Sequence, residues 1–276
     1  MKGAAKQFID SKLAIGVFSF SLSDLVKSTG LTEIAANNQL RRIGEAVVRV
    51  TPRQPYFLIV TPEYREFGAP PPLLWLDDYF NWLGHPYYLA LQSAAALYGS
   101  SQQAVQEVQV ITNVQISDIV FSRVRVRFYF KLATVEAQIQ QAPFAHAPLN
   151  VSTPETTAYD LIRYASGIGG IERAAETIYP MMQEMNSHRL KKVLDVGREI
   201  STAQRLGYIL KNGGPNKLER VVLDWLPKYK KIIPINLGAE VSHDMDINKE
   251  YGLILNTSGA SLSNRAENLA VQGEDE

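Results

Sequence analysis

The sequence predicts an α+β protein built from two modules of unequal size. Its 276 residues exceed the usual length of one domain, and its 46% hydrophobic content can give each module a core. Residues 68–72, Gly-Ala-Pro-Pro-Pro, cannot continue a helix or a sheet ladder. We therefore expect an N-terminal domain at residues 1–68, a larger mixed α/β C-terminal domain with several helices at 73–256, and a flexible tail at 257–276.

Apolar residues recur at helical spacing in three segments of the N-terminal module. Residues 4–13 are expected to form the first helix. The second begins after Ser21, with Asp24 placed to complete a capping box, and ends at Gly30, because glycine readily adopts the left-handed conformation. Thr32 caps the third helix. The apolar residues of that helix fall on one stripe: Ala36, Leu40, Ile43 and Val47.

A two-stranded ribbon is expected after the three helices. Residues 47–51 and 56–61 are rich in β-formers, and the segment 52–55, Pro-Arg-Gln-Pro, joins them. Helix, turn, helix and ribbon is the element order of a winged helix-turn-helix, whose recognition helix enters the major groove of DNA. The N-terminal module is therefore predicted to be a winged helix-turn-helix.

The outer face of the third helix carries side chains that can read DNA. With the apolar stripe turned inward, Asn38, Arg41 and Arg42 point outward, together with Ile34 and Glu45. Asparagine and arginine pair with adenine and guanine edges, while other basic residues and a helix N-terminus hold phosphates. The predicted DNA-binding residues are Thr32, Asn38, Arg41, Arg42, Arg49 and Arg53. The alternative is the solvated face of an ordinary amphipathic helix.

Charge is distributed unevenly, although 28 basic residues balance 28 acidic ones. Residues 1–66 contain nine basic and six acidic side chains, a net charge of +3. This field is modest, and each neutralised phosphate adds only a small increment to affinity. Tight binding is therefore expected to need a dimer or a cooperative pair of copies on DNA.

The C-terminal module is predicted to mix strands and helices. Helices are expected at residues 73–83, 86–98 and 154–165, the last capped by Thr153, with several more between 171 and 226. Glycines are expected to interrupt these later helices at positions 197, 207 and 213–214. Strands are expected at residues 107–112, 119–131, 231–237 and 251–256.

One of these strands carries a second basic feature. Arg123, Arg125 and Arg127 alternate with apolar residues, so the three arginines are expected to share one face. Such a face can meet nucleic acid or an acidic protein partner. The alternative is the wet side of an edge strand, where charge discourages aggregation.

Motifs for catalysis, metals and cofactors are weak or missing. Gly167-Ile-Gly-Gly170 resembles a dinucleotide fingerprint, but it follows a predicted helix rather than a strand. His243, Asp244 and Asp246 lack further ligands at a recognised spacing. With no cysteine, the chain has neither disulfides nor a thiolate nucleophile. We expect no enzyme, no cofactor and no metal; with no signal peptide or membrane span recognised, we expect a cytoplasmic location and no membrane contact.

Five ordered stretches resemble the AbiEi-type antitoxins of type IV toxin-antitoxin (abortive infection) systems. They begin at Phe20, Pro55, Pro86, Val124 and Val151 and read FSLSDLVKSTGLTEIAANNQLRRI, PYFLIVTPEYREFGAPPP, PYYLALQSAAALYGSSQQAVQEVQVIT, VRVRFYFK and VSTPETTAYDLIRY. The third stretch is the most specific. The resemblance implies a winged-helix repressor of its own promoter and a C-terminal domain that counters a nucleotidyltransferase-like toxin, with or without a stable complex.

The wing departs from the pattern of that family, which commonly has Arg-Gly before an aromatic pair. Here Gln54-Pro55 precedes Tyr56-Phe57, which removes a flexible glycine and a donor N–H. The resemblance therefore does not carry wing contacts with the minor groove over to this turn, whereas it places the recognition helix at residues 32–45.

Two other functional classes fit parts of the sequence. A winged-helix regulator whose C-terminal domain senses a small molecule is the main alternative, because aromatic side chains can line a ligand pocket. The aromatic residues concerned are Trp75, Tyr79, Trp82, Tyr87 and Tyr88, although their spacing also suits a packed core. A nucleic-acid enzyme that uses the arginine strand is the third class.

Overall fold

The computed structural model describes residues 3–100, 107–142, 149–213, 215–242 and 244–257. The chain divides into two compact units. The first consists of Met1–Leu89, Gln106–Val135 and Gln141–Asn150, and the second of Ala90–Val105, Glu136–Gln140 and Val151–Glu276. The boundary predicted after residue 68 lies inside the first unit, and the domain limits 1–68 and 73–256 stay predictions. Residues 258–276 of the predicted tail lie outside the described residues.

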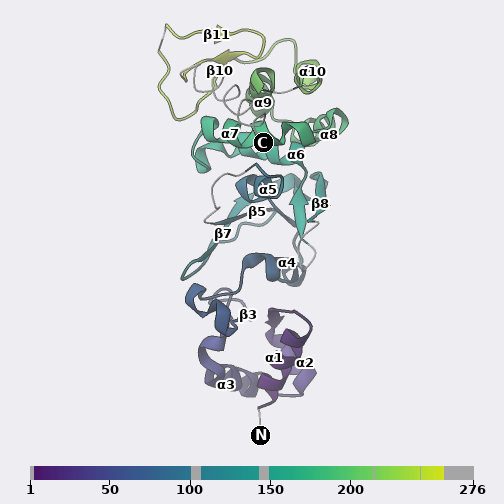
Figure 1. Cartoon of the computed structure of the whole chain (residues 1–276), viewed down its shortest axis with the longest axis vertical. Helices are drawn as coiled ribbons and strands as arrows, with labels where there is room; N and C mark the ends of the chain where they lie inside the picture. The colour runs from purple at the N-terminus through teal and green to yellow at the C-terminus, as the bar shows by residue number, and fades with distance from the viewer. Residues whose placement is uncertain (1–2, 101–106, 143–148, 214, 243, 258–276) are drawn as a thin grey trace, which may run out of the picture. The chain divides into compact units, whose positions relative to one another are not determined.

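The first unit begins with three helices and a small antiparallel sheet (Figure 1). The helices are α1 (Ala4–Ala14), α2 (Leu22–Thr29) and α3 (Glu33–Ile43). The strands are β1 (Ser19–Ser21), β2 (Val47–Arg49) and β3 (Tyr56–Ile59), in the order β1-β3-β2. The predicted ribbon is present as β2 and β3, and β1 adds a third strand that pairs Ser19 with Leu58 and Ser21 with Tyr56.

Local capping signals fix the ends of α2. The Ser21 hydroxyl accepts from the Asp24 backbone N–H at 3.1 Å, and the Asp24 carboxylate accepts from the Ser21 N–H at 3.0 Å, which confirms the predicted capping box. Gly30 ends the helix at φ 69°, in the left-handed region that glycine adopts without strain. Thr32 then caps α3, so the turn between the two helices is only a few residues long.

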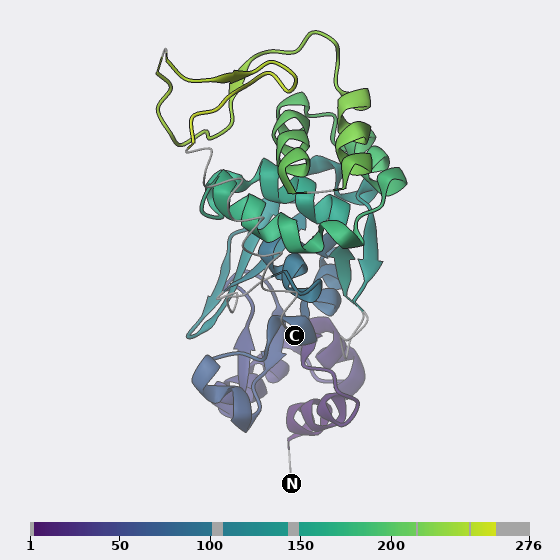
Figure 2. The same ribbon diagram turned by 45° about the horizontal axis from the view of Figure 1, so that its top comes forward.

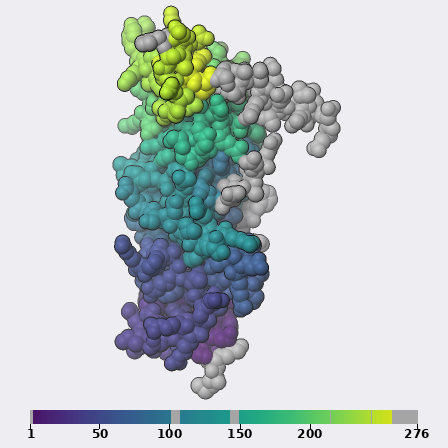
Figure 3. All heavy atoms as spheres, turned by 90° about the vertical axis from the view of Figure 1, so that its left-hand side faces the viewer, coloured from purple at the N-terminus to yellow at the C-terminus, as the bar shows by residue number. Residues whose placement is uncertain are grey.

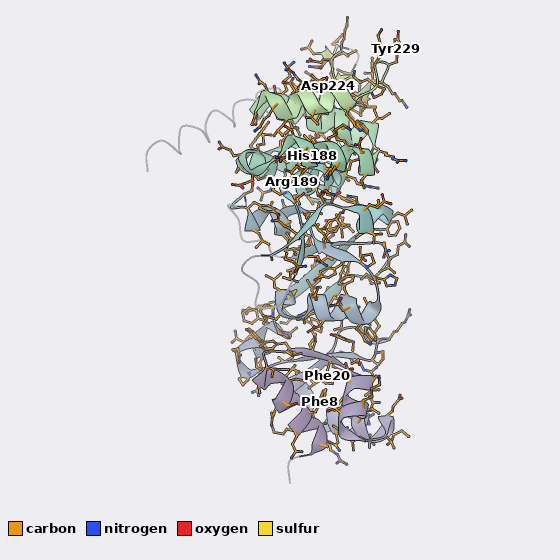
Figure 4. All side chains as sticks on the ribbon, turned by 90° about the vertical axis from the view of Figure 1, so that its right-hand side faces the viewer. Phe8, Phe20, His188, Arg189, Asp224 and Tyr229 are labelled. Carbon is orange, nitrogen blue, oxygen red and sulfur yellow. The ribbon has the colours of Figure 1, made fainter. Side chains whose placement is uncertain are left out.

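One apolar core joins the three helices to the sheet. Phe8 of α1 and Phe20 of β1, both labelled in Figure 4, meet edge to face with ring centroids 5.3 Å apart. Phe20 also stacks on Phe57 of β3. The helix stripe turns inward as predicted for Ala36 and Leu40, which are both buried. The buried members of this core are Ala5, Phe8, Ile9, Phe20, Leu22, Leu25, Ala36, Leu40, Phe57 and Ile59.

The rest of the first unit starts with short helical turns. These are the 3-10 turns η2 (Pro62–Phe67) and η3 (Pro72–Leu74), followed by helix α4 (Leu76–Leu83). The predicted helix at 86–98 is wrong at its start, because Tyr87–Leu89 forms strand β4 and the helix α5 covers only Leu91–Leu97. A short apolar run suits a buried strand as well as a buried helix, so periodicity does not separate them.

A six-stranded sheet has the order β6-β7-β5-β4-β9-β8. Its strands are β4 (Tyr87–Leu89), β5 (Val108–Thr112), β6 (Ile119–Phe121), β7 (Val124–Phe130), β8 (Ile139–Gln141) and β9 (Asn150–Ser152). The single strand predicted at 119–131 is a hairpin, in which β6 pairs with β7 antiparallel and Phe121 faces Val124. Strand β5 pairs with β7 in parallel and with β4 antiparallel.

Helices dominate the second unit. They are α5, α6 (Pro154–Arg163), α7 (Ile171–Met181), α8 (Ser187–Gly197), α9 (Ile200–Gly213) and α10 (Asn216–Trp225). Thr153 caps α6 with Pro154 as its first residue, as predicted. Helices α9 and α10 pack side by side (Figure 2). Gly207 lies inside α9, so the interruption predicted there is wrong.

Three two-residue strands close the second unit. They are β10 (Ile233–Pro234), β11 (Ile247–Asn248) and β12 (Leu253–Ile254), in the order β10-β12-β11. Two buried polar residues of α9 hold this sheet: Gln204 donates to the carbonyl oxygens of Lys231 and Tyr251 at 2.9 and 2.7 Å. Arg205 donates to the carbonyl oxygen of Pro234 at 2.9 Å, and burial lowers the pKa of its guanidinium.

Candidate nucleic-acid interface

Helix α3 is held so that one face meets the core and the other meets solvent. The Thr32 hydroxyl accepts from the Ala35 backbone N–H at 3.3 Å, and Gly44 ends the helix at φ 67°. Leu40 is 6% exposed, which fixes the rotation of the helix about its own axis. The side of the first unit that carries α3 faces the viewer in Figure 3, where the residues of α3 are purple.

The solvent-facing side of α3 carries a stripe of mixed chemistry. Ile34, Asn38 and Arg41 follow one another at spacings of four and three residues, and all three are exposed, as is Arg42 beside them. No ion pair among the described residues involves Arg41 or Arg42. Both guanidinium groups therefore project into solvent without a described carboxylate to neutralise them.

A hollow of about 650 Å³ lies between this stripe and the small sheet. Most of the polar and basic groups that line the hollow belong to α3, whereas the sheet contributes two apolar side chains and Arg49. The lining residues are Ile34, Asn37, Asn38, Leu40, Arg41, Gly44, Val47, Arg49 and Phe57. Helix and sheet thus form one concave surface.

Arg49 belongs to the sheet side of the hollow. Its guanidinium lies 5.2 Å from the centroid of the Phe57 ring, and its Nη1 donates to the carbonyl oxygen of Pro52 at 3.2 Å. A cation over an aromatic face is attracted by the ring quadrupole. These two contacts hold Arg49 at the edge of the concave surface, and Arg53 lies exposed in the adjoining turn.

The turn between β2 and β3 is fixed by side chains. The Gln54 amide oxygen accepts from the Thr51 hydroxyl at 3.0 Å and from the Tyr79 hydroxyl of α4 at 2.6 Å. The Tyr56 ring lies 4.9 Å from the ring of Trp82, also on α4. These side-chain contacts hold the turn in a defined position, although residues 52–55 contain no glycine.

Strand β7 carries two of the three arginines of the predicted basic face, Arg125 and Arg127, which are two positions apart and so share a face. Arg123 lies in the turn before the strand, and its contact with Glu66 is long, at 4.0 Å, and exposed. Arg125 is exposed on β7. Arg127 pairs with Glu107 at 3.4 Å and lies 5.5 Å from the Tyr129 ring centroid, so its charge is used within the first unit.

Several of the remaining sequence candidates are part of the scaffold. The segment Gly167–Gly170 follows α6 and leads into α7, and Gly169 and Gly170 adopt φ of 102° and 96°, as a helix-to-helix turn requires. Trp75, Tyr79 and Tyr88 are each at most 1% exposed and serve as core residues. His243 lies outside the described residues, and within the described part of the chain no three His, Cys, Asp or Glu side chains are grouped to hold a metal.

Sequence reasoning missed the residues that shape the concave surface from the sheet side. Phe57 supports Arg49, and Gln54 anchors the turn through Tyr79, 25 residues away. Arg49 and Phe57 are cross-strand partners in the hairpin, and such pairing is a signal for the first of these contacts. No local pattern signals the second, because it depends on the placement of α4.

Comparisons with known proteins give the family of the C-terminal part. A family model described as the AbiEi antitoxin C-terminal domain matches residues 88–212. Residues 88–212 therefore carry an AbiEi antitoxin C-terminal domain. The resemblance to AbiEi-type antitoxins noted in the sequence is therefore confirmed, whereas the concave surface at α3 lies outside the matched residues.

A solved structure shares the fold. The crystal structure of RV2827C protein from Mycobacterium tuberculosis matches with a TM-score of 0.66 and 18% sequence identity, over 98% of this chain and 94% of that chain. At this identity the match concerns the fold alone. No curated protein matches the chain. Among the described residues, no helix is both long and apolar enough to cross a membrane.

Proposed function

We propose that this AbiEi antitoxin chain is also a transcriptional repressor that binds its own promoter through residues 1–68. The observation that carries the proposal is the exposed face of α3, with Asn38, Arg41 and Arg42 beside the hollow. Helix α3 follows α2 after a short turn and precedes a small antiparallel sheet, the order of a winged helix-turn-helix. In this proposal α3 is the recognition helix and the β2–β3 turn is the wing.

Each exposed residue of this surface has a role in the proposal. Asn38 pairs with an adenine edge, and Arg41 or Arg42 with a guanine edge, since these are the side chains whose donors match those bases. Thr32 lies at the N-terminus of α3, where backbone N–H groups and the helix dipole attract a phosphate. Arg49 and Arg53 hold phosphates from the wing side.

Charge supports binding by more than one copy. The net charge of +3 over residues 1–66 gives a modest electrostatic attraction to a polyanion. Two copies on neighbouring half-sites double the number of phosphate contacts. We therefore propose a dimer or a cooperative pair on the promoter.

The antitoxin role rests on the AbiEi domain. An antitoxin of this family implies a toxin as its partner in general. We propose that residues 73–256 counter a nucleotidyltransferase-like toxin of a type IV system, without catalysis by this chain. The exposed Arg123 and Arg125 are the candidate contacts for an acidic partner surface within this segment.

A binding experiment tests the DNA half. The variant Arg41→Ala with Arg42→Ala is expected to bind the DNA upstream of its own reading frame at least tenfold more weakly than the wild type, since each good base contact contributes about 1–3 kcal/mol. Fluorescence anisotropy at near-physiological salt measures the affinity, and circular dichroism checks the fold. The control, Lys217→Ala with Arg220→Ala, removes the same charge from exposed positions on α10. Equal affinities of the two double variants would remove the DNA assignment.

A growth experiment tests the antitoxin half. The chain is expressed together with the product of the adjacent reading frame, which is expected to inhibit growth when expressed alone. Growth rescue by the full chain, and by the Arg41→Ala with Arg42→Ala variant, is expected because toxin control is assigned to residues 73–256. If the adjacent product is not toxic, or if the chain fails to rescue growth, this half of the proposal is wrong.

A further inference from the structure

Ile34 is a large apolar side chain on the exposed face of α3. It is 76% exposed, although the burial of an isoleucine side chain away from water is favourable. It lies in the first turn of the helix, two residues after the Thr32 cap, on the side opposite the buried Ala36 and Leu40. The fold therefore uses Ile34 neither for its core nor for capping.

The surroundings of Ile34 are those of a base-reading surface. It lines the hollow together with Asn38 and Arg41, which follow it along the same stripe. The neighbouring Asn37 amide is occupied within the helix, since its Nδ2 donates to the Glu33 carbonyl oxygen at 2.9 Å. Ile34 is thus an apolar contact point at one end of a polar and basic stripe.

We propose that Ile34 reads a thymine by packing against its C5-methyl group in the major groove. Thymine is the one DNA base that presents a methyl group there, and apolar side chains recognise it by contact. The inference rests on the proposed DNA binding through α3 and adds a specificity-determining residue to it. It assigns the three residues of the stripe to three bases: Ile34 to thymine, Asn38 to adenine and Arg41 to guanine.

Helix geometry fixes the spacing of these bases. A helix rises about 1.5 Å per residue, so Ile34 and Arg41 are about 10 Å apart along the axis of α3. Stacked base pairs are about 3.4 Å apart. For a helix axis aligned with the direction of base stacking, the thymine read by Ile34 is therefore expected about three base pairs from the guanine read by Arg41, with the adenine between them; a tilted helix shortens this spacing.

Replacing single thymines by deoxyuridine tests the proposal, because this change removes only the methyl group. The probe is the duplex upstream of the chain's own reading frame, with each thymine replaced in turn. At one thymine per half-site, deoxyuridine is expected to weaken wild-type binding about fourfold, the effect of one buried methyl group. The Ile34→Ala variant is expected to bind the unmodified duplex more weakly and to be insensitive to deoxyuridine at that thymine.

The matched control is Ile15→Ala, which removes an equally large side chain that is 73% exposed and lies at the end of α1, away from the residues that line the hollow. This variant should keep both the affinity and the deoxyuridine effect of the wild type. Sensitivity to guanine replacement, lost in Arg41→Ala, locates the guanine and so checks the spacing.

The outcomes separate this inference from the proposed function. If the wild type binds but no deoxyuridine weakens it, or if the effect persists in Ile34→Ala, the role of Ile34 is wrong while DNA binding stands. If Ile34→Ala instead abolishes self-association in sedimentation velocity without DNA, Ile34 serves a second copy of the chain and the inference is overturned. Failure of the wild type to bind the duplex at all contradicts the proposed function itself.

Discussion

The ion pair between Glu155 and Arg189 provides a test of how the AbiEi segment is held together. Glu155 lies in the first turn of α6 with no exposed side-chain surface, whereas the side chain of Arg189 on α8, which is labelled in Figure 4, is 41% exposed. The guanidinium Nε donates to both carboxylate oxygens, at 3.0 and 3.1 Å, and this hydrogen bonding raises the pKa of Arg189. The backbone N–H of Asn186, the cap of α8, also donates to Glu155. The carboxylate therefore fastens the start of α8 to α6.

The variant Arg189→Ala leaves the Glu155 carboxylate buried without its guanidinium partner. Breaking a fully buried ion pair from one side costs about 3–5 kcal/mol. Because the guanidinium is 41% exposed, water already screens part of the attraction, and we expect a loss of about 2–3 kcal/mol in the free energy of unfolding. For a unit of this size the melting temperature should fall by about 5–10 °C.

Urea and thermal unfolding followed by circular dichroism measure this loss. The control is Lys192→Ala, which removes one positive charge from an exposed position on the same helix. Equal stabilities of the two variants would refute the reasoning. The double variant Arg189→Met with Glu155→Leu should lose less than the sum of its single variants, because it leaves no buried charge unpaired.

Two further predictions concern packing and pH. A Cβ on Gly207 would lie 2.6 Å from the Tyr251 ring and 2.9 Å from Val222 Cγ1, so Gly207→Ala should lower the free energy of unfolding by about 1–3 kcal/mol despite the better helix propensity of alanine. Ser201→Ala, exposed on the same helix, should change it by less than about 0.5 kcal/mol; similar urea midpoints for the two variants would contradict this. Burial raises the pKa of the Tyr79, Tyr98 and Tyr179 hydroxyls from 10.0 to about 12. Because the folded state holds these three protons more tightly than the unfolded state, their contribution to the free energy of unfolding is complete below pH 10 and is lost as the pH rises towards 12. The absorbance of tyrosinate should show hydroxyl groups that ionise near pH 12. If replacing one of these three tyrosines by phenylalanine left that part of the titration curve unchanged, the raised pKa of that tyrosine would be disproved.

Features set by neighbouring residues could be predicted from the sequence. The Ser21–Asp24 capping box, the Gly30 helix end and the inward stripe of α3 each depend on residues within a few positions of one another. For the same reason the outward direction of Asn38 and Arg41 followed from helical periodicity alone. The residues that α3 contributes to the candidate site can therefore be predicted from the sequence.

Features that depend on distant partners could not be predicted. Strand β1 has three residues, too short for a detectable alternation, and it is a strand because it pairs with β3 almost forty positions later. The segment Tyr87–Leu89 has the apolar character of a buried helix, yet it pairs with β5. Arg123 continues the alternation of β7 in the sequence, but a hairpin turn takes it off the strand.

The turn between β2 and β3 shows how this distinction bears on function. The sequence lacks the glycine expected in the family's wing, and local reasoning interprets this as a loss of adaptability. In the structure, side-chain contacts fix the position of this turn. Gln54 accepts hydrogen bonds from Thr51 and Tyr79, and the ring of the adjoining Tyr56 packs on Trp82. A turn held in this way presents Arg53 at a defined place and loses little entropy when a ligand binds. A rigid wing would add affinity only for DNA whose groove matches its fixed position, so in the proposed function the altered turn favours selectivity over adaptability.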